Sequence, residues 1–207
     1  MLEKVRKILE TKKNRESFFS VVGRYFPRFS DDYKLIEQAY NTAKDAFRNQ
    51  SREDGERYFE HLRGVAIILM AYLRVRDANV IVAALLHDIA EDIPGWDEGR
   101  LALEFNQTVA VLVWWISKPS LEKFEGDKEA RNRAYHQNLH RAPRESLLIK
   151  LADRLHNLLT LWGCSEEKQR RKITETQDFY LSIAEDQVVL IHEIEAAINE
   201  IVSSWKK

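Results

Sequence analysis

The sequence predicts an all-α fold of roughly eight to ten helices, and three observations support this prediction. Apolar residues recur at steps of three and four over most of the chain, which is the spacing of a helix with one buried face. The 207 residues include only seven glycines and four prolines, too few for the many turns of a β-rich fold. A 44% share of hydrophobic residues is enough to build one large core.

The first strongly patterned helix is predicted over residues 30–49. Ser30 is a good N-cap, two acidic residues follow it, and the apolar positions then keep helical spacing. A second helix is expected over 58–73. A third, over 77–92, is apolar on nearly every side before His87, so we expect it to be central and buried.

The remaining helices are predicted from the same periodicity. Residues 96–117 contain one or two helices, and the highly charged segment 120–132 reads as a mobile loop or a helix start. A strong helix is expected over 144–162, and one or two long helices over 165–204. The last of these has an apolar stripe that either closes the core or forms a homodimer surface. The stripe consists of Val189, Ile191, Ile194, Ala197 and Ile201.

No repeat, low-complexity tract or linker divides the chain, so residues 1–207 are expected to form a single domain. Its core should span about 30–165, with helical extensions at both ends.

The net charge of −1 gives no general attraction for nucleic acid or an anionic membrane, and no apolar window is long enough to cross a membrane. The start lacks the apolar stretch of a signal peptide, and the single cysteine suits a reducing compartment. These features predict a cytoplasmic protein.

Ionisable residues are concentrated where the third helix should be most buried. The run AALLHDIAEDIP places four of them directly after an apolar segment: His87, Asp88, Glu91 and Asp92. Burying such groups without a partner is costly, and a metal ion would supply the partner.

Two imidazoles and two carboxylates on three separate helices make a suitable set of metal ligands. The set is His61, His87, Asp88 and Asp153. Mixed nitrogen and oxygen ligands suit Mn²⁺, Fe²⁺ or Zn²⁺ better than Ca²⁺, and the open positions would hold water or substrate. Each residue alone could equally be a helix cap, a surface group or a structural histidine, but the combination favours a metal site. Glu91 and Asp92 would then border the ion without binding it, where a carboxylate that activates water is expected.

Polar residues also follow Asp153 along one face of its helix. Asn157 and Thr160 lie four and seven residues beyond it, so all three share a stripe. Lys150 and Arg154 flank Asp153, and both could contact phosphate. For Arg154 an alternative stays open, in which it holds a ligand carboxylate in place. A structural role is favoured for three further histidines, His136, His140 and His156.

Five segments resemble the HD-domain phosphohydrolases, and within them the alarmone hydrolases of the Rel/SpoT type, including small stand-alone ones. The segments are AYNTAKDAF, REDGERYFEHLRGVA, VAALLHDIAED, FNQTVAVLVWWISK and LLIKLADRLHNLLTL. They follow the family order and cover about residues 30–165. The resemblance implies a helical HD domain that binds one Mn²⁺. It also implies removal of the 3′-pyrophosphate from guanosine tetra- or pentaphosphate, which releases pyrophosphate and GDP or GTP.

The resemblance also implies roles for individual residues. The four candidate ligands match the ligands of the family, and Glu91 with Asp92 matches the pair that handles the attacking water. Arg52 falls where the family carries a basic residue against the nucleotide base. Asn157 and Thr160 fall where it carries polar groups that face the base and the ribose.

One segment departs from the family pattern. The family reads Arg-Lys-Ser-Gly-Glu-Pro-Tyr before the first histidine, whereas this chain has REDGERY, so Glu53 and Asp54 replace a lysine and a small polar residue. Leu62 replaces a proline. Two acids near a polyanion should weaken its binding unless they face away. The identity of the nucleotide therefore stays open.

The sequence therefore predicts a hydrolase without a synthetase domain, for which the chain is too short, acting on a small-molecule nucleotide. One alternative is another HD-domain nucleotide phosphohydrolase, such as a 5′-nucleotidase or a nucleotide phosphatase. A second alternative is a non-catalytic alarmone sensor. The sensor would be favoured by loss of the Glu91 and Asp92 pair, and the pair is present.

Overall fold

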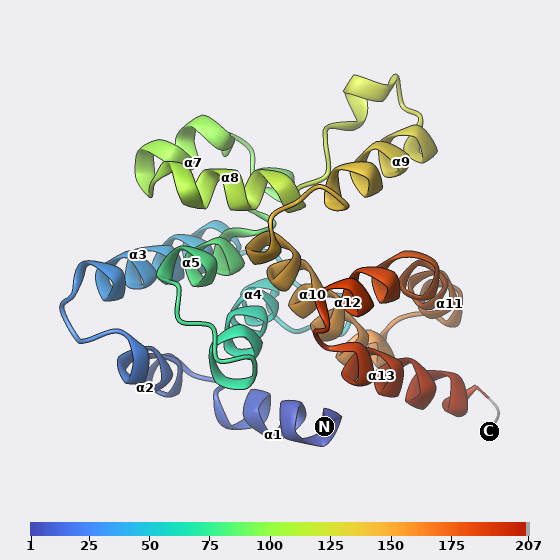
Figure 1. The fold of residues 1–207 in the computed structure, drawn as a ribbon, viewed down its shortest axis with the longest axis horizontal. Helices are drawn as coiled ribbons and strands as arrows, with labels where there is room; N and C mark the ends of the chain where they lie inside the picture. Colours follow the sequence, from blue (N-terminus) through green and yellow to red (C-terminus); the bar gives the residue numbers. More distant parts are fainter. Residues whose placement is uncertain (206–207) are drawn as a thin grey trace.

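The protein is built from helices joined by short turns, as seen in the computed structural model, which describes residues 1–205 (Figure 1). No β-strand occurs among these residues, and the one β-type pairing is an isolated bridge between Ser51 and Arg57. The prediction of an all-α fold is confirmed.

The first half of the chain contains the buried central helix, α5. In chain order the elements of this half are α1 (Leu2–Thr11), α2 (Arg15–Tyr25), α3 (Asp31–Ala46), α4 (Tyr58–Ile67), the π-helix η1 (Ile68–Tyr72), α5 (Ala78–Leu86) and α6 (Ile89–Asp92). Every residue of α5 except Asn79 is buried, and the helix packs against α3, α4, α8 and α10 (Figure 1). The α3 helix begins as expected, because the Ser30 hydroxyl accepts a hydrogen bond from the Tyr33 backbone N–H at 3.2 Å.

The second half is organised around α10, which crosses the middle of the molecule. Its elements are α7 (Glu98–Glu104), α8 (Gln107–Ile116), η2 (Leu121–Phe124), α9 (Lys128–Leu139), α10 (Arg144–Leu159), η3 (Leu161–Gly163), α11 (Glu166–Glu175), the π-helix η4 (Thr176–Tyr180), α12 (Leu181–Gln187) and α13 (Ile191–Ser204). The α10 helix contacts α4, α5 and α8 on one side and α12 and α13 on the other (Figure 1). It therefore joins the two halves of the core.

Several predicted helices are divided, so the helices are more numerous than the sequence predicts. The helix expected over 77–92 ends at Leu86, because Asp88 (φ −100°, ψ −3°) leaves the helical conformation before α6 begins. The segment 165–204 is also divided. Val188 and Leu190 adopt left-handed backbone conformations, with φ of 54° and 60°, between α12 and α13.

Burial shows what most of the C-terminal stripe does. Ile194, Ala197 and Ile201 are buried against the rest of the chain and close the core, whereas Val189 and Ile191 are half-buried. Trp114 lies on the outer face of α8 and is 47% exposed.

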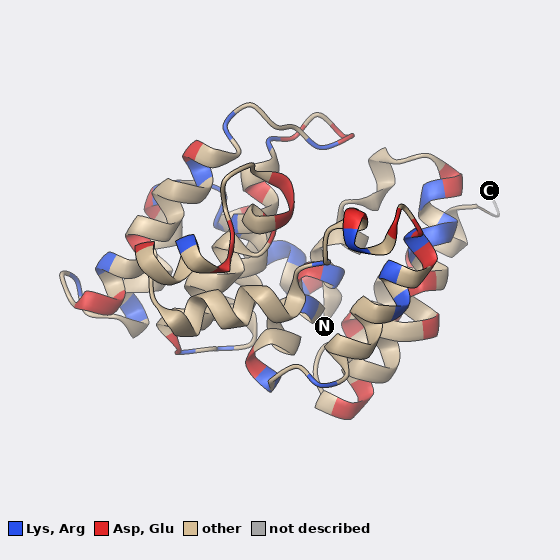
Figure 2. Ribbon diagram, turned by 90° about the horizontal axis from the view of Figure 1, so that it is seen from above, with Lys and Arg blue, Asp and Glu red and all other residues tan. Residues whose placement is uncertain are grey.

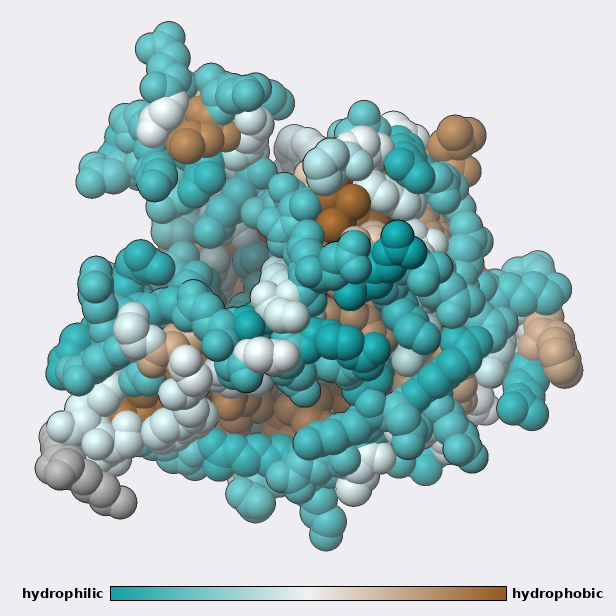
Figure 3. Space-filling view, turned by 180° about the vertical axis from the view of Figure 1, so that it is seen from behind, coloured by the Kyte–Doolittle hydropathy of each residue, from teal (hydrophilic) through white to brown (hydrophobic). Residues whose placement is uncertain are grey.

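The surface carries both signs of charge. Basic and acidic residues are interspersed over the helices in Figure 2. On the face seen in Figure 3, hydrophobic residues form small separate patches. Within the described residues, the helices are too short or too polar to traverse a bilayer.

Candidate metal centre and active site

The four candidate ligands meet at one point in the interior, and together they are called the metal cluster below. They are His61 from α4, His87 and Asp88 from the junction of α5 and α6, and Asp153 from α10. One ligand atom from each of the first three lies within 4.8 Å of the others. The Oδ1 atom of Asp153 is 3.2 Å from His61 Nε2 and 3.7 Å from His87 Nε2. Asp88 Oδ2 is 3.2 Å from His87 Nε2.

The donors of the metal cluster fit a divalent cation. His87 Nδ1 donates a hydrogen bond to the Ala84 carbonyl at 2.8 Å, which turns Nε2 toward the cluster. This Nε2 atom is buried and has no hydrogen-bond partner within residues 1–205. An unsatisfied buried nitrogen is costly, and an imidazole nitrogen is a good ligand for Mn²⁺, Fe²⁺ or Zn²⁺.

Neighbouring groups hold both ligand carboxylates in place. The Tyr58 hydroxyl donates to Asp88 Oδ2 at 2.7 Å, and the Tyr58 ring is stacked on Phe47. Asp153 accepts a hydrogen bond from Asn157 Nδ2 at 2.5 Å and forms a 3.0 Å ion pair with Lys150. Such outer contacts orient metal ligands before the ion binds.

Two buried carboxylates need positive charge, and the chain supplies it. Burial lowers the pKa of the His87 imidazole, but Asp88 and Asp153 outweigh burial and raise this pKa to about 10. Burial raises the pKa of Asp153, but Lys150 and the two histidines outweigh it and hold this pKa well below its ordinary value. A divalent cation would therefore compete with a proton on His87 Nε2.

Glu91 and Asp92 lie on α6 and border the same cavity as His61 and Asp88. The Glu91 carboxylate accepts a hydrogen bond from the Lys118 backbone N–H at 2.7 Å. Burial raises the pKa of Glu91, and it also raises the pKa of Asp92, to which the nearby Asp88 charge adds. The expectation of one continuous helix through these acids was wrong, but both still face the cavity.

The cavity has a volume of about 410 Å³ and is open to solvent. Beside the metal cluster it is lined by four cations, called the cation wall below: Lys118, Lys150, Arg154 and Lys172. Arg154 forms a 3.1 Å ion pair with Glu175, and its guanidinium lies 3.8 Å from the centre of the Tyr180 ring. Burial and the neighbouring Arg154 lower the pKa of Lys172.

A second group of polar side chains lines the cavity near the end of α10. Arg52 donates hydrogen bonds to Asn157 Oδ1 at 2.9 Å and to Thr160 Oγ1 at 3.1 Å. The three residues that the family resemblance assigns to the nucleoside therefore lie together. Their neighbour His156 is buried behind the metal cluster rather than in the cavity lining.

Both acids of the divergent segment have partners in the chain. Glu53 forms a 2.7 Å ion pair with Lys168 of α11. The Asp54 carboxylate accepts a hydrogen bond from the Glu56 backbone N–H at 2.9 Å, which shapes the turn. Both residues line the cavity, but Lys168 offsets the charge of Glu53 and thereby reduces its repulsion of an anion.

Sequence reasoning missed several residues that line the cavity. Tyr58 could have been found, since it lies three residues before His61 and therefore on the same helix face. The sequence does not predict the cavity position of three lysines, because nothing in a charged loop or a charged helix tells which lysine faces a cavity. They are Lys118, Lys168 and Lys172. The packing of α11 against the rest of the molecule brings Lys168 and Lys172 to the cavity, and the loop after α8 brings Lys118.

The model of the HD domain family matches residues 39–189 of the chain. The chain is 36% identical over 188 residues to the bifunctional (p)ppGpp synthase/hydrolase SpoT of Escherichia coli K12, which covers 90% of this chain and 26% of that protein. It is 39% identical over 144 residues to the guanosine-3′,5′-bis(diphosphate) 3′-pyrophosphohydrolase of Haemophilus influenzae, which covers 69% of this chain and 21% of that protein. The chain thus spans about a quarter of the length of these curated relatives.

One similar solved structure is described as a metazoan ortholog of SpoT that hydrolyzes ppGpp. Its TM-score is 0.64 at 25% sequence identity, and the match covers 80% of this chain and 94% of that chain. These relatives confirm the resemblance predicted from the five sequence segments. Because the family model spans more than half of the sequence, and because the fold is entirely helical, the chain belongs to the HD-domain family.

Proposed function

We propose that this protein is a metal-dependent pyrophosphohydrolase that removes the 3′-pyrophosphate from guanosine tetra- or pentaphosphate. The observation that carries the proposal is the meeting of the metal cluster, two further carboxylates and the cation wall in one cavity. The functions described for the relatives from Haemophilus influenzae and the metazoan support the choice of substrate. The products would be pyrophosphate and GDP or GTP.

Membership of the HD-domain family implies a divalent metal, and His61, His87, Asp88 and Asp153 would hold it. We propose Mn²⁺, with Fe²⁺ and Zn²⁺ as alternatives, because the ligand set mixes imidazole and carboxylate. The bound ion would polarise the 3′-linked phosphate and make water more acidic.

Glu91 and Asp92 would then accept the proton that the attacking water loses. Burial raises the pKa of Glu91, which makes it a better proton acceptor than an exposed glutamate. Its hydrogen bond to the Lys118 N–H fixes the direction of the carboxylate, so its second oxygen can face the water. Asp92 is less buried and would assist by orienting the water.

The cation wall would hold the pyrophosphate group. Charges on the phosphate oxygens would meet Lys150 and Arg154 from α10, Lys118 from the loop after α8, and Lys172 from α11. The ion pair with Glu175 positions Arg154 in advance, so little reorganisation is needed as charge develops on the phosphate.

Arg52, Asn157 and Thr160 would receive the nucleoside. The hydrogen bonds from Arg52 hold its planar guanidinium inside the cavity, where it can stack on a base. Glu53 and Asp54 in the same lining favour a second candidate, another HD-domain nucleotide phosphohydrolase whose substrate carries less charge.

The test is a substrate panel with the purified chain loaded with Mn²⁺. Guanosine tetraphosphate, GDP and several 5′-monophosphates are incubated in parallel, and the products are separated by ion exchange. Release of pyrophosphate from guanosine tetraphosphate at the highest kcat/KM is expected. Faster release of orthophosphate from a monophosphate would replace the proposal with the second candidate.

A further inference from the structure

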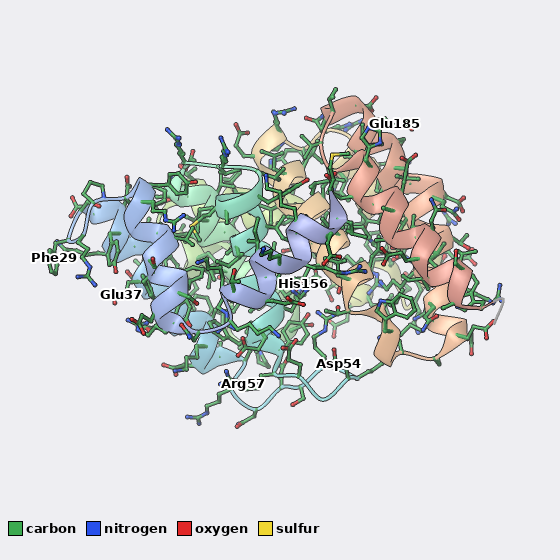
Figure 4. All side chains as sticks on the ribbon, turned by 90° about the horizontal axis from the view of Figure 1, so that it is seen from below. Phe29, Glu37, Asp54, Arg57, His156 and Glu185 are labelled. Carbon is green, nitrogen blue, oxygen red and sulfur yellow. The ribbon has the colours of Figure 1, made fainter. Side chains whose placement is uncertain are left out.

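We propose that His156 is a positioning residue, which holds His61 in the tautomer that can bind the metal, and that residue 64 is glycine to make room for it. The proposal rests on the metal site of the proposed function and is independent of the nucleotide. His156 lies near the middle of the molecule in Figure 4, at a distance from the edge that carries Asp54 and Arg57.

The two histidines are joined directly in the interior. His61 Nδ1 and His156 Nδ1 are 3.1 Å apart, and the side chains meet edge to face with ring centres 4.9 Å apart. Both residues are buried, at 1% and 6% exposure. The other ring nitrogen of His61, Nε2, faces Asp153 Oδ1 at 3.2 Å. His61 therefore has a carboxylate at one nitrogen and an imidazole at the other.

This arrangement makes the two tautomers of His61 compete. With its proton on Nε2, His61 can donate to Asp153, but that nitrogen then has no lone pair for a metal. With its proton on Nδ1, His61 frees Nε2 for the metal and needs an acceptor for the Nδ1 proton. His156 Nδ1 is that acceptor.

The position of its ring suits His156 to the role of acceptor, because its Nδ1 atom lies 3.1 Å from His61 Nδ1. A neutral imidazole keeps one lone pair, which the geometry directs at His61. His156 would then carry its own proton on Nε2.

Gly64 is explained by the same ring. It lies three residues after His61 on α4 and faces α10, and glycine is unfavourable in the interior of a helix. A Cβ atom at this position would lie 2.1 Å from His156 Nε2 and 2.3 Å from its Cδ2 atom. Any larger residue would displace the His156 ring and with it the contact to His61.

The first test compares two substitutions by titrating the metal-free full chain with Mn²⁺. His156→Leu removes the acceptor, whereas His156→Asn places an amide oxygen near the position of Nδ1. We expect His156→Leu to weaken Mn²⁺ binding about ten- to a hundred-fold, as for other residues that orient a metal ligand, and His156→Asn to restore most of it. Equal affinities for the two variants would overturn the proposal, since a purely structural role does not depend on an acceptor.

The second test uses Gly64→Ala, with Gly23→Ala as its matched control. Gly23 is also inside a helix, but a Cβ there would meet nothing within 4 Å. Gly64→Ala should weaken Mn²⁺ binding as much as His156→Leu does, and Gly23→Ala should leave it unchanged. In a chain that already carries His156→Ala, the added Gly64→Ala should have no further effect. Normal Mn²⁺ affinity in Gly64→Ala would contradict the proposal.

A direct measurement is independent of how well the variants fold. Nitrogen NMR of the unaltered chain with Zn²⁺, which is diamagnetic, reports which ring nitrogen of His61 carries the proton. The proposal expects protonated Nδ1, and a proton on His156 Nδ1 instead would overturn it. No nucleotide is present in these measurements, so failure of the substrate proposal would leave their outcome unaffected.

Discussion

The metal cluster and residues 52–54, at the start of the divergent segment, line the same cavity but are built in different ways. Each member of the metal cluster is buried or nearly so and has a hydrogen-bond or ion-pair partner in the interior, such as Tyr58 for Asp88 and Lys150 for Asp153. Glu53, in contrast, is exposed and is held mainly by one ion pair with Lys168 at the cavity rim. The difference suggests that the chemistry depends on the core, whereas nucleotide selection depends on a few surface contacts that can change without disturbing it.

The largest effect should come from breaking the metal cluster. Asp88→Ala removes one charge and one ligand, so the chain should lose both the ion and activity, with kcat/KM falling about a thousand-fold or more. Atomic emission measures the metal content, and separation of the products by ion exchange measures the hydrolytic activity. The exposed Asp45 on α3 provides the control, and Asp45→Ala should change neither. Full metal content in Asp88→Ala would remove this residue from the ligand set.

Glu91→Gln and Asp92→Asn should separate chemistry from binding in the same region. Both variants should keep the metal and the fold, because neither acid belongs to the metal cluster. Loss of a general base should lower kcat about a hundred-fold, while KM stays the same or falls because a negative charge beside a polyanion is removed. Steady-state kinetics with metal content confirmed measures this. Wild-type kcat in both variants would leave these acids with no part in catalysis.

Metal binding should depend on pH with a defined sign. The pKa of His87 is raised to about 10, so at neutral pH a proton must leave Nε2 before the ion binds. Mn²⁺ affinity should therefore fall as pH is lowered, by about tenfold per pH unit for one released proton. Titration calorimetry between pH 6 and 8 in buffers of different ionisation enthalpy counts the proton. An affinity that is constant over this range would show that His87 is already deprotonated.

The smallest effect should come from the nucleoside region. Arg52→Ala removes a guanidinium that can stack on the base, and it should raise KM about three- to tenfold with little change in kcat, which is a uniform-binding effect. Its hydrogen bonds join only Asn157 and Thr160, so the metal cluster should stay intact. Initial-rate kinetics with guanosine tetraphosphate tests this. A fall in kcat with KM unchanged would show that Arg52 acts in the chemical step. The division between a catalytic region and a nucleotide-binding region would then be wrong.

Sequence reasoning was most successful where local spacing and burial act together. His87 and Asp88 stand out because charge follows directly after an apolar helix, and Asp153 shares a helix face with Asn157 and Thr160. The structure brings His87, Asp88 and Asp153 together with His61 in one cluster. The break of the helix after Leu86 was not predictable, since it depends on the backbone conformation of Asp88 at the site.

Residues supplied by tertiary packing could not be found in this way. Lys168 and Lys172 lie on α11, whose sequence is charged on most sides, so only the packing of this helix shows which lysines reach the cavity. The partner of Glu53 was hidden for the same reason, because 115 positions separate it from Lys168. The contact between His61 and His156 likewise joins α4 to α10 and has no local signature.

The most direct test of the central claim is anomalous diffraction from crystals grown with Mn²⁺. The account predicts a single strong peak at the metal cluster, within bonding distance of His61 Nε2, His87 Nε2 and the carboxylates of Asp88 and Asp153. The side chains of Glu91 and Asp92 should face the ion without touching it. A peak elsewhere on the chain, or one bound by Glu91 in place of Asp153, would contradict the assignment of ligands and of the water-activating pair.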